Sequence, residues 1–297
     1  MNAPVLPPTR PALRYHGGKW RLAPWIIEHL PAHRTYVEPF GGAASVLLRK
    51  RRAYAEVYND LDGEVVAFFR VLQDTPAAAR LISLLELTPF ARDEFALSYE
   101  DAADPVEAAR RLVARSFMGF GSNAHASSSR GHRSTGFRAN SSRSGTTPAQ
   151  DWRNYPAALV TIIERFRGVV IENRDALAVM AQHDAPTTLH YVDPPYQHHL
   201  RAPAGGDIGL RGMYRHEMVE ADHLQLLEAL LRLDGMVVLS GYPDALYDDA
   251  LRSWTRVETR AFADGARERT EVLWINPAAW LALRAAAGPL FAGEARR

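Results

Sequence analysis

The chain has 297 residues, 47% of them hydrophobic and 23% charged, which is ordinary globular composition and excludes wholesale disorder. It contains no cysteine, so disulfide scaffolds, zinc–thiolate sites, iron–sulfur clusters and cysteine nucleophiles are excluded. Lysine plus arginine number 35 and aspartate plus glutamate 34, so the net charge alone indicates no partner.

Arginine supplies nearly all of the positive charge, because Lys19 and Lys50 are the only lysines. This bias is consistent with a GC-rich genome, and equally with bidentate contacts to phosphates and bases. No apolar run reaches the ~18–20 residues of a membrane span. Residues 1–14 are proline-rich and lack the apolar region of a signal peptide, so we expect a cytoplasmic protein.

The first elements predict a nucleotide-binding unit. Residues 35–38 are typical of a short strand, residues 39–42 of a turn and residues 43–52 of a helix. Residues 55–58 are typical of a second strand, which ends in Asn59 and Asp60. A strand, a turn, a helix and a second strand that ends in an acid form the order of a βαβ unit that binds nucleotides.

Residues 63–150 have a different character. Residues 63–73, 76–87 and 105–116 predict helices with no strand among them. Residues 116–150 contain no aspartate or glutamate and are rich in serine, glycine and asparagine. This pattern predicts an inserted helical subdomain with a basic loop, although a solvated, disordered loop has the same composition. Four arginines stand in this loop: Arg130, Arg133, Arg138 and Arg143.

The remainder returns to alternating strands and helices, which predicts a doubly wound α/β sheet with an antiparallel pair at its end. The strands are expected at residues 169–172, 189–192, 236–239, 256–262 and 270–275, and the helices at 151–166, 175–182 and 216–233.

The turn after the first strand carries Gly41 and Gly42. Glycines let the chain turn tightly and let a ligand approach the backbone, and the next helix offers free N–H groups. Asp60 follows 18 residues after Gly42, at the end of the second strand, where a carboxylate can accept hydrogen bonds from a ribose diol. Without that acid, a purely structural turn would be the better explanation of the glycines, and the acid makes a ligand-binding turn the preferred one.

A second motif, Asp193-Pro194-Pro195-Tyr196, follows a buried-strand pattern. Two prolines fix φ and remove two N–H donors, so the Asp193 carboxylate and the Pro194 carbonyl form a rigid pair of acceptors beside an exposed aromatic ring. Such a pair suits a planar group with an exocyclic NH₂, on whose face the ring can stack. The alternative is a proline turn that merely ends a strand.

A third motif lies near the amino terminus, from Arg14 to Lys19. Gly17 and Gly18 beside a lysine can hold a carboxylate or phosphate as a point charge, and a plain amino-terminal turn explains them equally well.

Together these blocks resemble the Dam-type (D12 class) N6-adenine DNA methyltransferases, over about residues 13–276. The blocks are residues 15–19, 38–42 and 59–60, together with the Asp-Pro-Pro-Tyr motif at 193–196. The resemblance implies a class I methyltransferase fold with S-adenosylmethionine as cofactor. It also implies a catalytic domain of residues 1–62 and 151–297 with an inserted target-recognition subdomain, 63–150.

The resemblance assigns site residues. Tyr15 and Lys19, with Gly17 and Gly18 between them, would contact the methionine end of the cofactor, and Asp60 would hold its ribose. The binding turn would comprise Glu38, Pro39, Phe40, Gly41, Gly42 and Ala43. Asp175 would lie beside the cofactor adenine, unless it only caps a helix. Asp193, Pro194, Pro195 and Tyr196 would hold the target adenine, with Asp193 also beside the cofactor, and Arg14 would reach DNA.

Two departures limit the resemblance. The cofactor turn of the family usually reads Phe-x-Gly-x-Gly, whereas Ala44 stands at the last glycine. The added methyl is mild, and we expect weaker approach of the cofactor at worst. The blocks with which Dam-type enzymes recognise GATC are not recognisable between Asp62 and Asp151, so GATC specificity is not implied.

We therefore expect methyl transfer to the N6 amine of an adenine flipped out of a specific double-stranded DNA sequence. Asn123 would bind adenine edges, and the loop arginines would bind phosphates or guanine.

We expect a monomer that works at the nucleoid. Four histidines near the motif, at 198, 199, 216 and 223, are not spaced for a metal site, and residues 197–213 are expected to close over the flipped base.

Alternatives remain open. The methylated amine could be cytosine N4 or an adenine in RNA, or the chain could be a catalytically dead DNA-binding module of the same fold. A glutamine-modifying methyltransferase usually carries asparagine where Asp193 stands, which argues against that class. A restriction–modification system, a phage and an orphan enzyme would all have this sequence pattern.

Replacing Arg130, Arg133, Arg138 and Arg143 with alanine should weaken DNA binding and flatten its dependence on salt. A protein that contacts fewer phosphates releases fewer counterions from the DNA when it binds. Binding titrations at several salt concentrations measure both quantities. Unchanged affinity and an unchanged salt slope would mean that the loop lies off the DNA.

Overall fold

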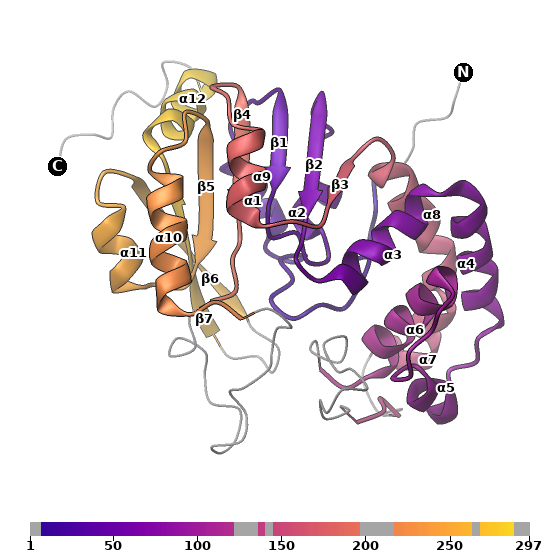
Figure 1. Ribbon diagram of the computed structural model, residues 1–297. Coiled ribbons are helices and arrows are strands. Elements are labelled where there is room, and N and C mark those ends of the chain that lie inside the picture. The colour runs from indigo at the N-terminus through magenta and orange to yellow at the C-terminus, as the bar shows by residue number, and fades with distance from the viewer. Residues whose placement is uncertain (1–6, 122–135, 140–144, 197–216, 263–267, 288–297) are drawn as a thin grey trace.

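The computed structural model describes residues 7–121, 136–139, 145–196, 217–262 and 268–287. Its centre is a seven-stranded sheet in the order β3-β2-β1-β4-β5-β7-β6 (Figure 1). Strands β1 to β5 pair in parallel, whereas β7 runs antiparallel to both β5 and β6. The strands are β1 (Thr35–Glu38), β2 (Ala55–Asn59), β3 (Val170–Glu172), β4 (Thr188–Val192), β5 (Met236–Gly241), β6 (Thr255–Phe262) and β7 (Glu268–Ile275).

Helices cover both faces of this sheet. Leu226 and Leu227 of α10 form one core cluster with Val192, Val237 and Leu239. The alternate strand residues Tyr191 and Val238 point to the opposite face and share the main core with Ala279 of α12. The first face carries α9 (Ala176–Gln182), α10 (Glu220–Leu230) and α11 (Ala245–Ala250), and the second carries α1 (Ala23–Glu28), α2 (Ser45–Arg49) and α12 (Pro277–Ala287).

A group of helices gathers beyond the β3 edge of the sheet (Figure 1). An aromatic stack joins it to the sheet, because Phe69 of α3 stacks on Phe166 of α8 at 4.3 Å and packs on Tyr58 of β2 at 4.8 Å. The hydrophobic core is therefore continuous between the two parts. The group comprises α3 (Gly63–Gln73), α4 (Thr75–Leu87), α5 (Arg92–Leu97), α6 (Pro105–Met118), α7 (Pro148–Arg153) and α8 (Tyr155–Phe166).

The α/β architecture and all seven predicted strands are confirmed, whereas some helices differ from the prediction. The helix expected at 43–52 is the shorter α2, because Ala44 takes a left-handed φ of 55° before it. The single helix expected at 151–166 is two helices, because Pro156 has no N–H with which to continue the first. Helices α1, α5, α11 and α12 were not predicted.

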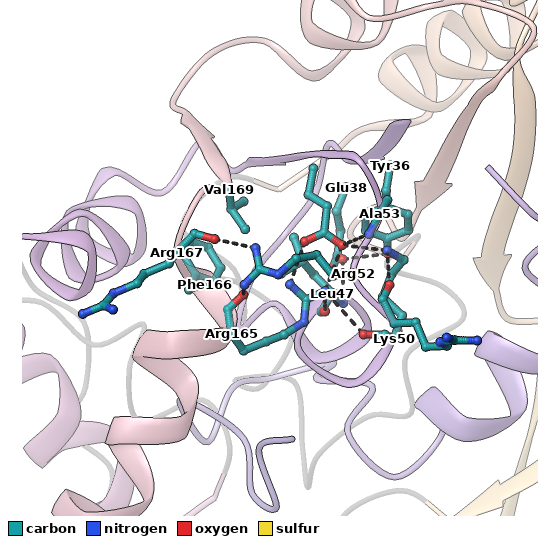
Figure 2. A network of polar contacts seen from close by, with 12 residues as sticks. Tyr36, Glu38, Leu47, Lys50, Arg52, Ala53, Arg165, Phe166, Arg167 and Val169 are labelled. Carbon is teal, nitrogen blue, oxygen red and sulfur yellow. Dashed lines mark hydrogen bonds and ion pairs between the residues drawn. The ribbon is translucent and has the colours of Figure 1, made fainter. Parts of the chain in front are cut away.

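A buried ion cluster lies beneath α2 (Figure 2). The carboxylate of Glu56 is only 2% exposed and lies 2.7 Å from Lys50 Nζ and 2.6 Å from Arg165 Nη1. Arg165 also donates to the Leu47 carbonyl, and Arg52 donates to the Arg165 carbonyl at 2.8 Å. One carboxylate thus holds β2, the end of α2 and α8 together.

The protonation of Glu56 follows from these partners. Burial by itself would raise the pKa of Glu56, but the hydrogen bonds and charges of Arg165 and Lys50 outweigh burial, so the pKa lies below its ordinary 4.5. A carboxyl whose pKa is lower in the folded state contributes stability at pH values above the unfolded-state pKa. That contribution is lost as the pH falls through the folded-state pKa.

Glu56→Gln should lower the free energy of unfolding at neutral pH by about 3–5 kcal/mol, because two buried cations then lack their counter-charge. Urea unfolding at pH 7 measures the loss, and the difference from wild type should shrink in acid. Glu228→Gln, which breaks the exposed pair with Arg232, is the matched control and should cost less than about 1 kcal/mol. Equal losses in the two variants would contradict a stabilising role for the buried cluster.

Candidate active site

A cavity of about 280 Å³ opens at the carboxyl edge of the sheet, where β1, β2 and β4 end. Because these strands are parallel, their following segments meet at one edge. All thirteen residues expected at the cofactor line this cavity, together with Pro194 and Pro195. The thirteen are Tyr15, Gly17, Gly18, Lys19, Glu38, Pro39, Phe40, Gly41, Gly42, Ala43, Asp60, Asp175 and Asp193.

The turn after β1 is held against β2. Gly41 donates its N–H to the Asn59 carbonyl at 2.8 Å, and the Tyr58 hydroxyl donates to the Gly42 carbonyl at 2.7 Å. A Cβ on Gly41 would lie 2.2 Å from the Tyr58 ring, so only glycine fits there. Gly42 takes a φ of +47°, which glycine adopts without strain.

Ala44, at the position of the family's last glycine, is fully buried in the hydrophobic core. The described residues that line the cavity do not include it. Its left-handed φ of 55° costs an alanine about 1–2 kcal/mol relative to glycine. The departure therefore costs backbone free energy and leaves the cavity surface unchanged.

Glu38 closes the floor of the cavity. Its Oε2 accepts from the Tyr36 hydroxyl at 2.8 Å and from the Leu47 N–H at 3.0 Å. Burial is the largest influence on this carboxyl and raises its pKa to about 8. Since a positive charge in the cavity would favour the ionised form, the site is suited to a cationic ligand.

Asp60 is fixed at the end of β2, where its two oxygens accept from the N–H groups of Gly42 at 2.7 Å and Asp62 at 2.8 Å. These two contacts fix the orientation of the carboxylate at the cavity wall. Asp175 is the N-cap of α9 and accepts from the Ala178 N–H at 2.9 Å. The capping interpretation of Asp175 is thus correct, and Asp175 lines the cavity as well.

Asp193 stands directly after β4 and accepts from three side chains. Lys19, which is 7% exposed, lies with its Nζ 3.0 Å from Oδ2. Ser240 donates to Oδ1 at 2.7 Å, and the Tyr196 hydroxyl lies 3.2 Å from the same oxygen. These contacts fix the orientation of the carboxylate at the end of β4.

The sequence analysis expected an exposed Tyr196 ring, and this prediction is wrong. The side chain is only 9% exposed, and it is not among the residues that line the cavity. Tyr242 packs against its ring at 4.4 Å, Lys19 Nζ lies 4.7 Å from the ring centre, and its hydroxyl lies 3.2 Å from Glu271 Oε2. The strands β5 and β7 bring Tyr242 and Glu271 to this place.

Two of the residues expected at DNA lie together at the end of α6. Arg14 donates to the Gly119 carbonyl at 3.4 Å, and Arg138 donates to the Phe117 carbonyl at 3.2 Å. The other four, Asn123, Arg130, Arg133 and Arg143, lie outside the described residues.

The expected closing segment 197–213 and three of the four histidines also lie outside the described residues. The fourth, His223, is buried and its Nδ1 lies 2.7 Å from the Tyr247 hydroxyl. Within the described ranges, no three His, Cys, Asp or Glu side chains are arranged to hold a metal ion. No helix in the described part of the chain is long and apolar enough to span a membrane.

The motifs at this edge agree with a comparison against models of protein families. Residues 15–204, more than half of the chain, match the model of the D12 class N6 adenine-specific DNA methyltransferases. The chain belongs to this family. No curated protein matched it. The matched segment starts at Tyr15 and ends beyond Tyr196, so it contains each block of the resemblance.

Three residues beyond the matched segment, which the sequence analysis missed, contact the motif residues of this methyltransferase. Ser240 contacts Asp193, and Tyr242 and Glu271 contact Tyr196. Ser240 carried a signal, because it follows a predicted strand at its carboxyl end. Glu271 lies within a predicted strand, so only the pairing of β5 with β7 shows that it reaches the site.

Gly41→Ala should destabilise the methyltransferase by about 1–3 kcal/mol and weaken cofactor binding, because the fully buried Tyr58 ring cannot move away from the new methyl. Thermal unfolding and a cofactor titration measure the two effects. Gly136→Ala is the control, since a Cβ there meets no atom within 4 Å. A Gly41→Ala protein with wild-type stability and affinity would show that the turn tolerates a side chain.

Proposed function

We propose that this methyltransferase transfers the methyl group of S-adenosylmethionine to the N6 amine of an adenine flipped out of a specific sequence in double-stranded DNA. One observation carries the proposal: the Asp193 carboxylate, followed by Pro194, lies at the cavity and is held by Lys19 and Ser240. A carboxylate and a neighbouring carbonyl are the two acceptors that an exocyclic NH₂ needs.

The chemistry of the cavity suits this cofactor. The buried Glu38 favours a positive charge nearby, and the sulfonium of S-adenosylmethionine is a cation. When bound, the cofactor supplies an electrophilic methyl group. Asp60 would accept from the ribose hydroxyls and Asp175 would lie beside the adenine, while Tyr15 and Lys19 would hold the methionine end. The residues from Glu38 to Ala43 would surround the middle of the cofactor.

The chain's own contribution to catalysis is positioning and charge. The N6 lone pair of adenine is delocalised into its ring, so the amine is a poor nucleophile, and its nitrogen gains positive charge during the transfer. Asp193 and the Pro194 carbonyl would stabilise that charge more in the transition state than in the ground state. No strong base is required, because the N–H becomes acidic once the methyl is attached.

An adenine within a duplex cannot reach these acceptors, so the nucleotide would be flipped out. The Tyr196 ring contacts Lys19 and Tyr242. To stack on the flipped base, it would have to give up one of these two contacts. The inserted part, residues 63–150, would recognise the target sequence. Arg138 of this part and Arg14 of the catalytic domain, which lie together at the end of α6, would contact phosphates. We propose that the enzyme acts as a monomer inside the cell, on the nucleoid.

The direct test is transfer of labelled methyl from S-adenosylmethionine to unmethylated DNA, followed by digestion and identification of the modified nucleoside. Labelled N6-methyladenine is the expected product, and sequencing of the modified sites then gives the recognition sequence. Label in N4-methylcytosine, or in RNA but not in DNA, would overturn the substrate assignment and keep the methyl-transfer chemistry. No label in any nucleic acid would overturn the proposal.

Asp193→Ala and Asp193→Asn should both lower the rate of methyl transfer by at least about 100-fold, because the charge that stabilises the transition state is lost. Affinity for the cofactor should change far less, since the other twelve cofactor residues remain in place. Single-turnover rates and a cofactor titration separate the two effects. Asp249→Asn, at an exposed residue, should behave as wild type. Full activity in either Asp193 variant would show that this carboxylate is not catalytic.

A further inference from the structure

We propose that Glu271 is a positioning residue for methyl transfer, which in its protonated form donates to Tyr196 and so directs the Tyr196 hydrogen to Asp193. This inference rests on the proposed function, because it concerns the carboxylate to which that function assigns the chemistry. Glu271 stands on β7, Tyr196 follows β4 and Ser240 is on β5, and these strands lie side by side (Figure 1).

The Tyr196 hydroxyl has a single hydrogen and two neighbouring carboxyl groups. The Tyr196 hydroxyl lies 3.2 Å from Asp193 Oδ1 and also 3.2 Å from Glu271 Oε2. A phenol has one hydrogen, so with both carboxyls ionised one of the two contacts would bring lone pairs together in a buried place. Such an unsatisfied contact is unfavourable, and a second proton on one of the carboxyls removes it.

The surroundings place that proton on Glu271. Asp193 already receives a hydrogen on each of its oxygens, from Lys19 Nζ at 3.0 Å and from the Ser240 hydroxyl at 2.7 Å. Glu271 is 8% exposed, and burial is the largest influence that raises its pKa above the ordinary 4.5. Asp193 raises this pKa further, whereas Lys19, the Tyr196 hydrogen bond and Arg269 lower it without cancelling the effect of burial.

The neighbouring elements supply the other groups around Glu271. Tyr242 follows β5 and packs edge-on against Tyr196, and its hydroxyl accepts from Arg269 at 2.9 Å. On β6, the residue paired with Glu271 is Thr259, which does not titrate. Among the described residues, no lysine or arginine forms an ion pair with the Glu271 carboxyl.

The arrangement determines which oxygen of Asp193 meets the substrate. Oδ1 accepts from Ser240. It also accepts from Tyr196, whose hydrogen points to Asp193 when Glu271 is protonated, so both lone pairs of Oδ1 are used. Oδ2 accepts from Lys19 and retains a lone pair for the substrate amine. When Glu271 loses its proton, the Tyr196 hydrogen is divided between two carboxylates, and Asp193 is held less firmly. The rate of transfer should therefore fall as the pH rises through the pKa of Glu271.

The test compares wild type with Glu271→Gln, whose amide can still donate to Tyr196 but cannot ionise. At neutral pH its single-turnover rate should stay within about threefold of wild type, and the loss of rate that wild type shows as Glu271 deprotonates should be absent. Glu271→Ala should lose about tenfold, the equivalent of one hydrogen bond of roughly 1.4 kcal/mol, at an unchanged cofactor affinity. Glu258→Gln, an exposed carboxyl on β6, is the control and should keep the wild-type profile.

A second readout does not depend on activity. The infrared difference spectrum between wild type and Glu271→Gln at neutral pH should contain the carbonyl band of a protonated carboxyl. Absence of that band, or a wild-type pH profile in Glu271→Gln, would overturn the proposal. A rate in Glu271→Gln as low as in Glu271→Ala would also overturn it, because the negative charge would then be required. If wild type methylates nothing, the band alone decides where the proton lies, and the failure concerns the proposed function.

Discussion

The ion pair between Lys19 and Asp193 connects the parts of the site that are far apart in the chain. Lys19 belongs to the amino-terminal segment and Asp193 follows β4, and their contact at 3.0 Å closes the cavity between the two motifs. Lys19 also donates to the Gly17 carbonyl at 3.0 Å, so the pair fixes the glycine turn as well as the acid. Because both partners are largely buried, loss of either one would leave a charge without compensation.

Around this pair, the enzyme keeps more carboxyl groups than cations. Glu38 and Glu271 are buried and have raised pKa values. Among the described residues that line the cavity, Lys19 is the one lysine or arginine. Protonation of the two glutamates limits the repulsion between three acids in a small volume. A cationic ligand in the cavity would favour ionised Glu38 and release its proton. In the proposed function, the site would thus accommodate the positive charge of the cofactor and the positive charge that develops on the amine during transfer.

The sequence predicted the parts of this site that depend on local pattern. Apolar runs identified the seven strands, and the parallel order of β1, β2 and β4 then required Gly41, Asp60 and Asp193 to share one edge. The burial of Tyr196 was not predictable in this way, because it results from the pairing of β7 with β5. Six-residue helices such as α1 and α5 are too short to show a helical period, and the left-handed Ala44 gives no signal in composition.

The carboxyl edge of the sheet therefore contains two layers of interactions with different origins. The inner layer is the motif set of the family, whose turns line the cavity. The outer layer consists of Ser240, Tyr242 and Glu271, which reach the site from β5 and β7, beyond the matched segment, and contact the motif residues rather than line the cavity. Ser240 contacts Asp193 directly and Glu271 contacts it through Tyr196, so in the proposed function this outer layer would help to orient the Asp193 carboxylate toward the substrate.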